Sequence, residues 1–269
     1  MKRQCWLLLV VFTLAVFLIP INAFADDPKA RDIMQKVEDR DDGDNQTTNM
    51  LMTLTDKNND KRKKYFKNFR KDYGKDTKTI MFIERPANIK NTGFLTFDYD
   101  DADRDDDQWL FLPALGKTKR IASSDKSGSF MGSDLNYSDL TDRELEDYDY
   151  KLLKETTLGG HKVWLIESIP RSEEVIDETG YKKSILAVRQ DNYVVVKSKS
   201  WTDEGGYVKV MDVKKLELIE GIWVATEIHV VKRQGKVVKH QTLLQFANVK
   251  FNQNLEDDLF TIRRLEKGL

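Results

Sequence analysis

Apolar and polar residues alternate through the chain from Met50 almost to the C-terminus, and this pattern limits the possible folds more than any other feature. Successive side chains of a β-strand point to opposite faces, so each such segment can bury one face and expose the other. Pairs such as Gly159-Gly160, Glu220-Gly221 and Gln234-Gly235 separate the segments, as is typical of hairpins. About ten or eleven strands are predicted from twelve candidate segments. The segments are Met50–Thr55, Lys64–Phe69, Lys78–Glu84, Gly93–Tyr99, Gln108–Leu112, Asp149–Leu153, His161–Ile169, Tyr181–Arg189, Tyr193–Trp201, Tyr207–Ile219, Ile222–Lys232 and Lys236–Phe251.

One helix is predicted before the first strand. Asp27 is a suitable N-cap, and Pro28 follows at the first helical position. The helix should reach to about Arg40 and present one apolar face, made by Ile33, Met34 and Val37.

Many strands and a single helix exclude a βαβ architecture and favour a mainly β fold: a curved antiparallel sheet, an open barrel or a sandwich. The concave face of a strongly curved sheet needs a cover. The N-terminal helix and the central loop from Ala122 to Tyr137 are the available segments. Since the chain has no internal repeat and no linker rich in proline, glycine and serine, one domain is expected.

The first 25 residues are predicted to be a cleavable signal peptide. Met1-Lys2-Arg3 is basic, the apolar run from Trp6 to Ile19 is short for a membrane span, and Ala23-Phe24-Ala25 offers a cleavage site. The mature domain would then be residues 26–269, exported to the periplasm. An uncleaved anchor helix is the alternative. Cys5 lies within the signal, so the mature domain would have no cysteine and would depend on core burial for stability.

Charge argues against a nucleic-acid-binding protein. Removal of the two basic residues of the signal would lower the formal net charge from −1 to −3. Lysines and arginines are scattered among similar numbers of acidic residues, whereas a phosphate-binding surface needs a basic face.

The sequence offers little support for catalysis or for a cofactor. The three histidines are isolated, and residues 128–132 place Ser129 one position too early for a nucleophile elbow. The acidic run Asp98–Asp107 lacks the glycine and glutamate of an EF-hand loop, which favours a solvated hairpin tip over a metal site. No catalytic residue, metal or cofactor is therefore assigned. A hydrolase whose carboxylates are brought together only by folding is the weakest hypothesis and would require a polar cleft.

An unusual apolar stretch follows the acidic run. Trp109 and Phe111 alternate, so both should lie on one face of a strand. The glycine-flanked loop beyond them carries Phe130-Met131, and soft or aromatic side chains on such a loop suit a surface that adapts to an apolar ligand. Alternatively, Phe130 and Met131 plug the mouth of the barrel as core residues.

The segment Trp109–Tyr137, with Ser138-Asp139-Leu140 after it, closely resembles a signature of exported LolA-like proteins, which are labelled outer membrane lipoprotein-sorting proteins. Ile219–Thr226 and Leu259–Glu266 resemble the closing strands and tail of the same family. The resemblance extends over essentially the whole mature chain.

This resemblance implies a strongly curved, incompletely closed antiparallel barrel, covered by helix and loop, whose hydrophobic cavity accommodates acyl chains. It brings no catalytic residues. It also implies an RND-type lipid-exporting permease as a membrane partner. The chain is similar to the best-known lipoprotein carriers in architecture and not in close sequence, so the specific cargo is left open.

The leading hypothesis is a periplasmic carrier that passes lipid or lipoprotein acyl chains between an inner-membrane permease and an outer-membrane acceptor. Its predicted cavity or lid residues are Ile33, Met34, Val37, Trp109, Phe111, Phe130 and Met131. The alternative is a periplasmic accessory domain that docks an RND-type transporter and carries nothing. A carrier needs a cavity large enough for an acyl chain, whereas the interior of an accessory domain should be fully packed.

Overall fold

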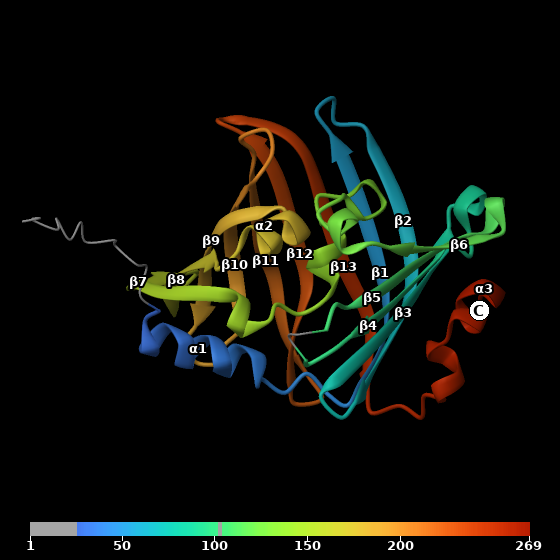
Figure 1. Ribbon diagram of the computed structural model, residues 1–269, viewed down its shortest axis with the longest axis horizontal. Coiled ribbons are helices and arrows are strands. Elements are labelled where there is room, and N and C mark those ends of the chain that lie inside the picture. The colour runs from blue at the N-terminus through green and yellow to red at the C-terminus, as the bar shows by residue number, and fades with distance from the viewer. Residues whose placement is uncertain (1–25, 102–103) are drawn as a thin grey trace, which may run out of the picture.

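The computed structural model describes residues 26–101 and 104–269, so the predicted signal peptide lies outside the described residues. Within them the chain is mainly β (Figure 1). The α-helices are α1 (Pro28–Glu38), α2 (Glu173–Thr179) and α3 (Ile262–Lys267). The strands are β1 (Asn45–Asp56), β2 (Lys61–Tyr73), β3 (Asp76–Arg85), β4 (Gly93–Asp98), β5 (Asp107–Leu112), β6 (Lys117–Ile121), β7 (Tyr148–Leu158), β8 (His161–Pro170), β9 (Tyr181–Arg189), β10 (Val195–Thr202), β11 (Val208–Ile219), β12 (Ile222–Gln234) and β13 (Val237–Phe251).

All the described strands belong to one antiparallel sheet. Its order is β6-β5-β4-β3-β2-β1-β13-β12-β11-β10-β9-β8-β7, so all strands that are consecutive in sequence pair with each other except β6 and β7, and β1 also pairs with β13. The sheet curves strongly, and β6 and β7 stay unpaired with each other at its two edges (Figure 1). The predicted incompletely closed antiparallel barrel is confirmed.

The residues between the two edges, 122–147, form a run of short 3-10 turns that we call the cover segment. With α1 and α2 it lies over the open side of the curved sheet (Figure 1). Apolar side chains of α1 pack with residues of the cover segment and of β7 to β9, among them Ile33, Met34, Leu145 and Ile166. The predicted cover, made of an N-terminal helix and a central loop, is thus present.

The opposite face of the sheet has its own cover near β3 to β5. Ile80 and Phe82 of β3 pack there against Phe260 and against Leu265 of α3. Gly93 of β4 permits this contact, because a Cβ atom at that position would lie 2.6 Å from Leu265 Cδ1. Since Met81 and Ile83 point to the concave side, both faces of β3 are buried.

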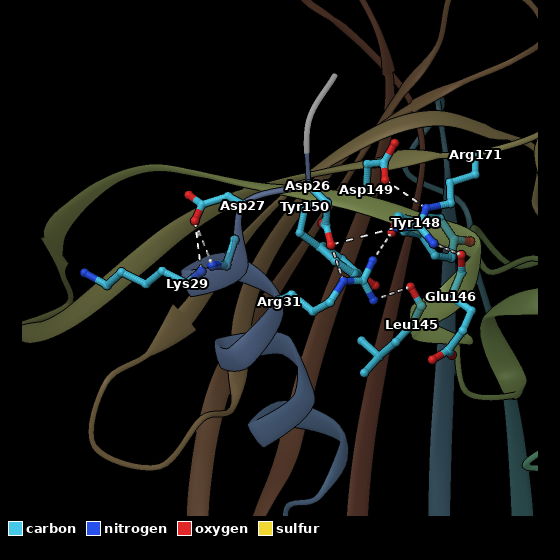
Figure 2. A network of polar contacts seen from close by, with 11 residues as sticks. Asp26, Asp27, Lys29, Arg31, Leu145, Glu146, Tyr148, Asp149, Tyr150 and Arg171 are labelled. Atoms are coloured by element: carbon cyan, nitrogen blue, oxygen red, sulfur yellow. Dashed lines mark hydrogen bonds and ion pairs between the residues drawn. The ribbon is translucent and has the colours of Figure 1, made fainter. Parts of the chain in front are cut away.

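The N-terminal residues of the described chain protect the exposed edge of β7 (Figure 2). Asp26 Oδ1 accepts a hydrogen bond from Tyr150 N at 2.8 Å, and Asp27 Oδ2 accepts one from Leu152 N at 3.2 Å. Asp27 also caps α1, as predicted, and Arg31 donates to the carbonyls of Leu145 and Tyr148. Edge amides that would otherwise be free to pair with another strand are therefore satisfied.

Three elements depart from the sequence prediction. No strand was predicted at residues 117–121, but they form β6, whose exposed Lys and Arg side chains hide the strand pattern. The prediction of a single helix was also wrong, because α2 follows β8 and α3 follows β13. Among the described residues, no helix is long and apolar enough to span a membrane.

Candidate functional site

A cavity of about 590 Å³ lies between the concave face of the sheet and the cover segment. Strands from both halves of the sheet contribute to its wall, including β1, β3 and β9 to β13. Its volume falls in the range of about 300–1,000 Å³ that is typical of small-molecule and cofactor sites.

Five of the seven methionines of the chain line this cavity. The methionine side chain is unbranched and polarizable, so it can adapt to ligands of different shape. Leucine, valine, isoleucine and phenylalanine side chains complete the apolar wall. The five methionines are Met34 of α1, Met50 and Met52 of β1, Met81 of β3 and Met211 of β11.

Cross-strand register arranges side chains of β11, β12, β13 and β1, several of which line this cavity, in rows that run from polar to apolar. The outermost row contains Lys209, Lys232 and His240 on β11, β12 and β13. Two residues further along each strand, the next row contains Met211, Val230, Thr242 and Leu54. The row after that is wholly apolar and contains Val213, Ile228, Leu244 and Met52. The barrel interior therefore has a polar end near β11 and a hydrophobic body.

Phe130 is the centre of the cover over this cavity. Its side chain is fully buried, and its ring lies 5.2 Å from that of Phe94 and 5.7 Å from that of Tyr137. Lys64 of β2 donates to the carbonyl of Met131, a residue with a positive φ of 49°. These contacts hold the Phe130-Met131 turn against the sheet.

A second set of contacts anchors the cover segment to β13. Asp134 is buried; its Oδ2 accepts a hydrogen bond from Thr242 Oγ1 at 2.7 Å and lies 2.8 Å from His240 Nδ1. Its backbone N donates to Thr242 Oγ1 at 2.9 Å. Removal of one partner of a buried polar cluster leaves the others without hydrogen bonds, which is costly, so this connection should hold the segment firmly.

A smaller pocket of about 330 Å³ continues the cavity toward α1. The two spaces share lining residues, among them Met34, Arg143 and Leu186, and Val37 lines only the smaller one. Movement of α1 would change the size of both spaces.

The structure divides the seven predicted cavity or lid residues into two groups. Met34 and Phe130 line the large cavity, Val37 lines the smaller pocket, and Ile33 and Met131 pack in the apolar clusters beside them. The remaining two, Trp109 and Phe111, lie together as expected. They pack in the cluster of Phe97, Phe260 and Leu265, on the face covered by α3, and so they lie away from the cavity.

Several acidic side chains cluster beside the large cavity, with which their pocket shares Asp142 and Arg143. A pocket of about 70 Å³ is lined by Asp106, Asp142, Arg143 and Glu144. Burial raises the pKa of Glu144 to about 7, and the neighbouring carboxylate of Asp106 adds to the shift. Burial, together with Asp106 and Asp142, likewise raises the pKa of Asp98 to about 8. Near neutral pH this acidic cluster is therefore less negative than its composition indicates.

Sequence reasoning did not identify the methionine wall or the polar end of the cavity. One signal was available. Lys209, Met211 and Val213 are two residues apart and so lie on the same face of β11, and a lysine on an otherwise apolar strand face is unusual. The methionines gave no comparable signal, because side chains that fill a core and side chains that line a cavity have the same strand pattern. Within the described residues, no group of three or more His, Asp or Glu side chains could hold a metal ion.

Several proteins of known structure have a similar fold. The crystal structure of a DUF1329 family protein from Desulfovibrio piger is similar, with a TM-score of 0.81 and 25% identity over 90% of this chain and 99% of that one. A putative outer membrane lipoprotein-sorting protein domain from Vibrio parahaemolyticus gives a TM-score of 0.79 and 26% identity, over 88% and 98% of the two chains. A LolA superfamily protein from Nitrosomonas europaea, at 18% identity over 87% and 98%, has the same fold with a TM-score of 0.65.

The sequence comparison gives a consistent result. No curated protein matches the chain. A family model described only as that of an uncharacterized protein matches residues 75–267, which is well over half of the sequence. Together, this match and the structural neighbours show that the chain belongs to the LolA-like family of outer membrane lipoprotein-sorting-like proteins.

Proposed function

We propose that this protein is a periplasmic carrier that binds the acyl chains of lipids or lipoproteins and passes them between membrane partners during outer-membrane sorting. The observation that carries the proposal is the cavity of about 590 Å³, lined by methionines and enclosed by a LolA-like sheet. An accessory domain with a fully packed interior would not need such a space.

The energetics of acyl transport explain why a cavity is required. Each methylene exposed to water costs about 0.8 kcal/mol, so a chain of about fifteen methylenes would face roughly 12 kcal/mol in crossing the periplasm unaided. A carrier must also release its cargo. Contacts from flexible methionine side chains suit both needs, since they can follow the chain during entry and exit.

Location and partners are part of this proposal. The predicted signal peptide supports export, and one structural neighbour is named as a putative outer membrane lipoprotein-sorting protein domain. We propose an inner-membrane RND-type permease as donor and an outer-membrane component as acceptor. The proposal assigns no catalytic residue and no cofactor. Transfer of a lipid from a site of lower affinity to a site of higher affinity requires neither.

A vesicle assay tests the carrier function directly. Donor vesicles containing a fluorescent acyl lipid and a quencher are mixed with acceptor vesicles, and transfer is followed as a rise in fluorescence. The wild-type protein should accelerate transfer in proportion to its concentration. Met211→Asp, which places a carboxylate in the cavity wall, should lose most of the acceleration, whereas Met211→Leu should keep it. If the wild-type protein neither binds the lipid nor accelerates its transfer, the accessory-domain function replaces the proposal.

A further inference from the structure

Lys209 is a buried cation at the polar end of the cavity. Its side chain lies on β11 and the residue is only 7% exposed. Its Nζ donates to Asn136 Oδ1 at 2.7 Å and to the hydroxyl of Tyr181 at 3.1 Å. Both acceptors are neutral, and an ammonium group has three hydrogens to donate. Among the described residues, no carboxylate forms an ion pair with this ammonium group.

A buried ammonium without a bonded anion is energetically unfavourable. Burial lowers the pKa of Lys209 to about 8, partly offset by the more distant carboxylates of Asp139 and Asp134. The side chain therefore remains mostly protonated at neutral pH, although its surroundings disfavour the charge. An anionic group that reached its Nζ from the cavity would relieve this penalty.

Lys209 also stands at a boundary. It lines the large cavity and, together with Lys232, an outer pocket of about 560 Å³. The side chains that follow it on the same face of β11, Met211 and Val213, point into the hydrophobic body of the cavity. A ligand with its apolar tail along Met211 and Val213 would thus bring its polar end to Lys209.

A second cation and a tyrosine complete this end of the cavity. Arg143 Cζ lies 5.2 Å from the centre of the Tyr181 ring, and Lys209 Nζ lies 5.1 Å from it. Tyr181 is fixed by a hydrogen bond of 2.7 Å from its hydroxyl to Asp139, which also forms an ion pair of 3.5 Å with Arg143. The tyrosine thereby positions both cations at the cavity wall, and Asp139 is engaged by Arg143 and Tyr181.

Four carboxylates line the outer pocket, those of Asp125, Asp177, Asp203 and Glu204, and among the described residues none of them forms an ion pair with Lys209. Asp125 is paired with Lys119 at 3.0 Å, and Asp203 is paired with Lys182 at 2.9 Å. The side chains of these two ion pairs are exposed, whereas Lys209 is buried between the large cavity and the outer pocket.

We propose that Lys209, supported by Tyr181 and Lys232, forms a head-group subsite for an anionic group, a carboxylate or phosphate, attached to the acyl chain in the cavity. This inference rests on the proposed carrier function and narrows its substrate class to acidic amphiphiles. The charged head would gain a charge-assisted hydrogen bond while the tail gains burial.

The test compares two ligands that differ only at the head. Palmitate and hexadecanol compete with a fluorescent fatty acid for the protein, and dissociation constants are measured for the wild type, Lys209→Met and Lys199→Met. Lys199 is an exposed lysine of the neighbouring strand β10, so its replacement makes the same change in net charge away from the subsite. The wild type and Lys199→Met should prefer palmitate by about tenfold or more, the effect expected of a hydrogen bond to a charged group. Lys209→Met should lose this preference and keep its affinity for hexadecanol.

A measurement on the wild-type protein tests the same proposal without depending on whether the Lys209→Met variant folds. Because the pKa of Lys209 is about 8, the wild type should lose its preference for palmitate between pH 7 and pH 9. Lys209→Arg should retain the preference at both values. Inorganic phosphate should not displace the probe, which separates a lipid head group from a free anion.

The outcomes are distinct. Equal affinity of the wild type for palmitate and hexadecanol, or an unchanged preference in Lys209→Met, would overturn the head-group subsite and leave the carrier function intact. Failure to bind either amphiphile would overturn both. If inorganic phosphate without an acyl chain displaced the probe, the site would bind free anions, and the head-group subsite would also be overturned.

Discussion

Replacement of Phe130 by alanine is expected to lower the free energy of unfolding by about 3–5 kcal/mol, the range found when a fully buried phenylalanine is truncated. Its ring is 0% exposed and packs edge-on against Phe94 and Tyr137. Its loss would leave a void between the sheet and the cover segment. The change is measured by urea denaturation followed by tryptophan fluorescence.

The matched control is Leu115→Ala, since Leu115 is 64% exposed and its truncation should change stability by less than about 0.5 kcal/mol. A loss below about 1 kcal/mol for Phe130→Ala would mean that the cover segment packs weakly on the sheet. In that case Phe130 would act as a mobile lid only, and the packed cover described above would be incorrect.

Replacement of Ala225 by tryptophan is expected to weaken acyl binding strongly with little loss of stability. Ala225 lines the large cavity, so an indole there would occupy space that the ligand needs. If the indole excludes about three methylenes of the ligand at about 0.8 kcal/mol each, the binding free energy weakens by about 2.4 kcal/mol, which is a roughly fiftyfold loss of affinity. In a fully packed core the same enlargement would instead destabilise the fold by about 1–3 kcal/mol.

Titration with a fluorescent fatty acid gives the affinity, and thermal unfolding gives the stability. Val224→Trp is the matched control, because Val224 is the adjacent residue on β12 and lines none of the cavities described above. It should bind the ligand as the wild type does. A strongly destabilised Ala225→Trp variant would indicate that the interior is packed and would favour the accessory-domain function.

Local signals in the sequence were sufficient to predict much of this fold. The Asp27-Pro28 start of α1 and its apolar face are present, and hairpin turns such as Glu220-Gly221 connect the strands as expected. The edge strand β6 was missed because its sequence, Lys117 to Ile121, is mostly charged, as is common where a strand edge faces solvent. Helix α2 did carry a signal, an N-cap at Ser172 and a left-handed Gly180 at its end.

Assignment of strand faces to the cavity could not be made from the sequence. The alternation of Trp109 and Phe111 correctly indicates a shared face. It does not say which face, because α3 covers one side of this part of the sheet and the cover segment covers the other. Leu265 of α3 is distant in sequence from β5, so only the folded chain shows that these aromatic side chains contact the C-terminal helix.

The central claim, that the cavity holds an acyl chain, is tested most directly by native mass spectrometry of the wild-type protein purified from the periplasm, with identification of the extracted lipids. We predict a population whose added mass equals one acyl lipid per chain, and which is absent when Ala225→Trp is purified in the same way. A wild-type protein that emerges without lipid and still binds none after incubation with acidic or neutral amphiphiles would contradict the account.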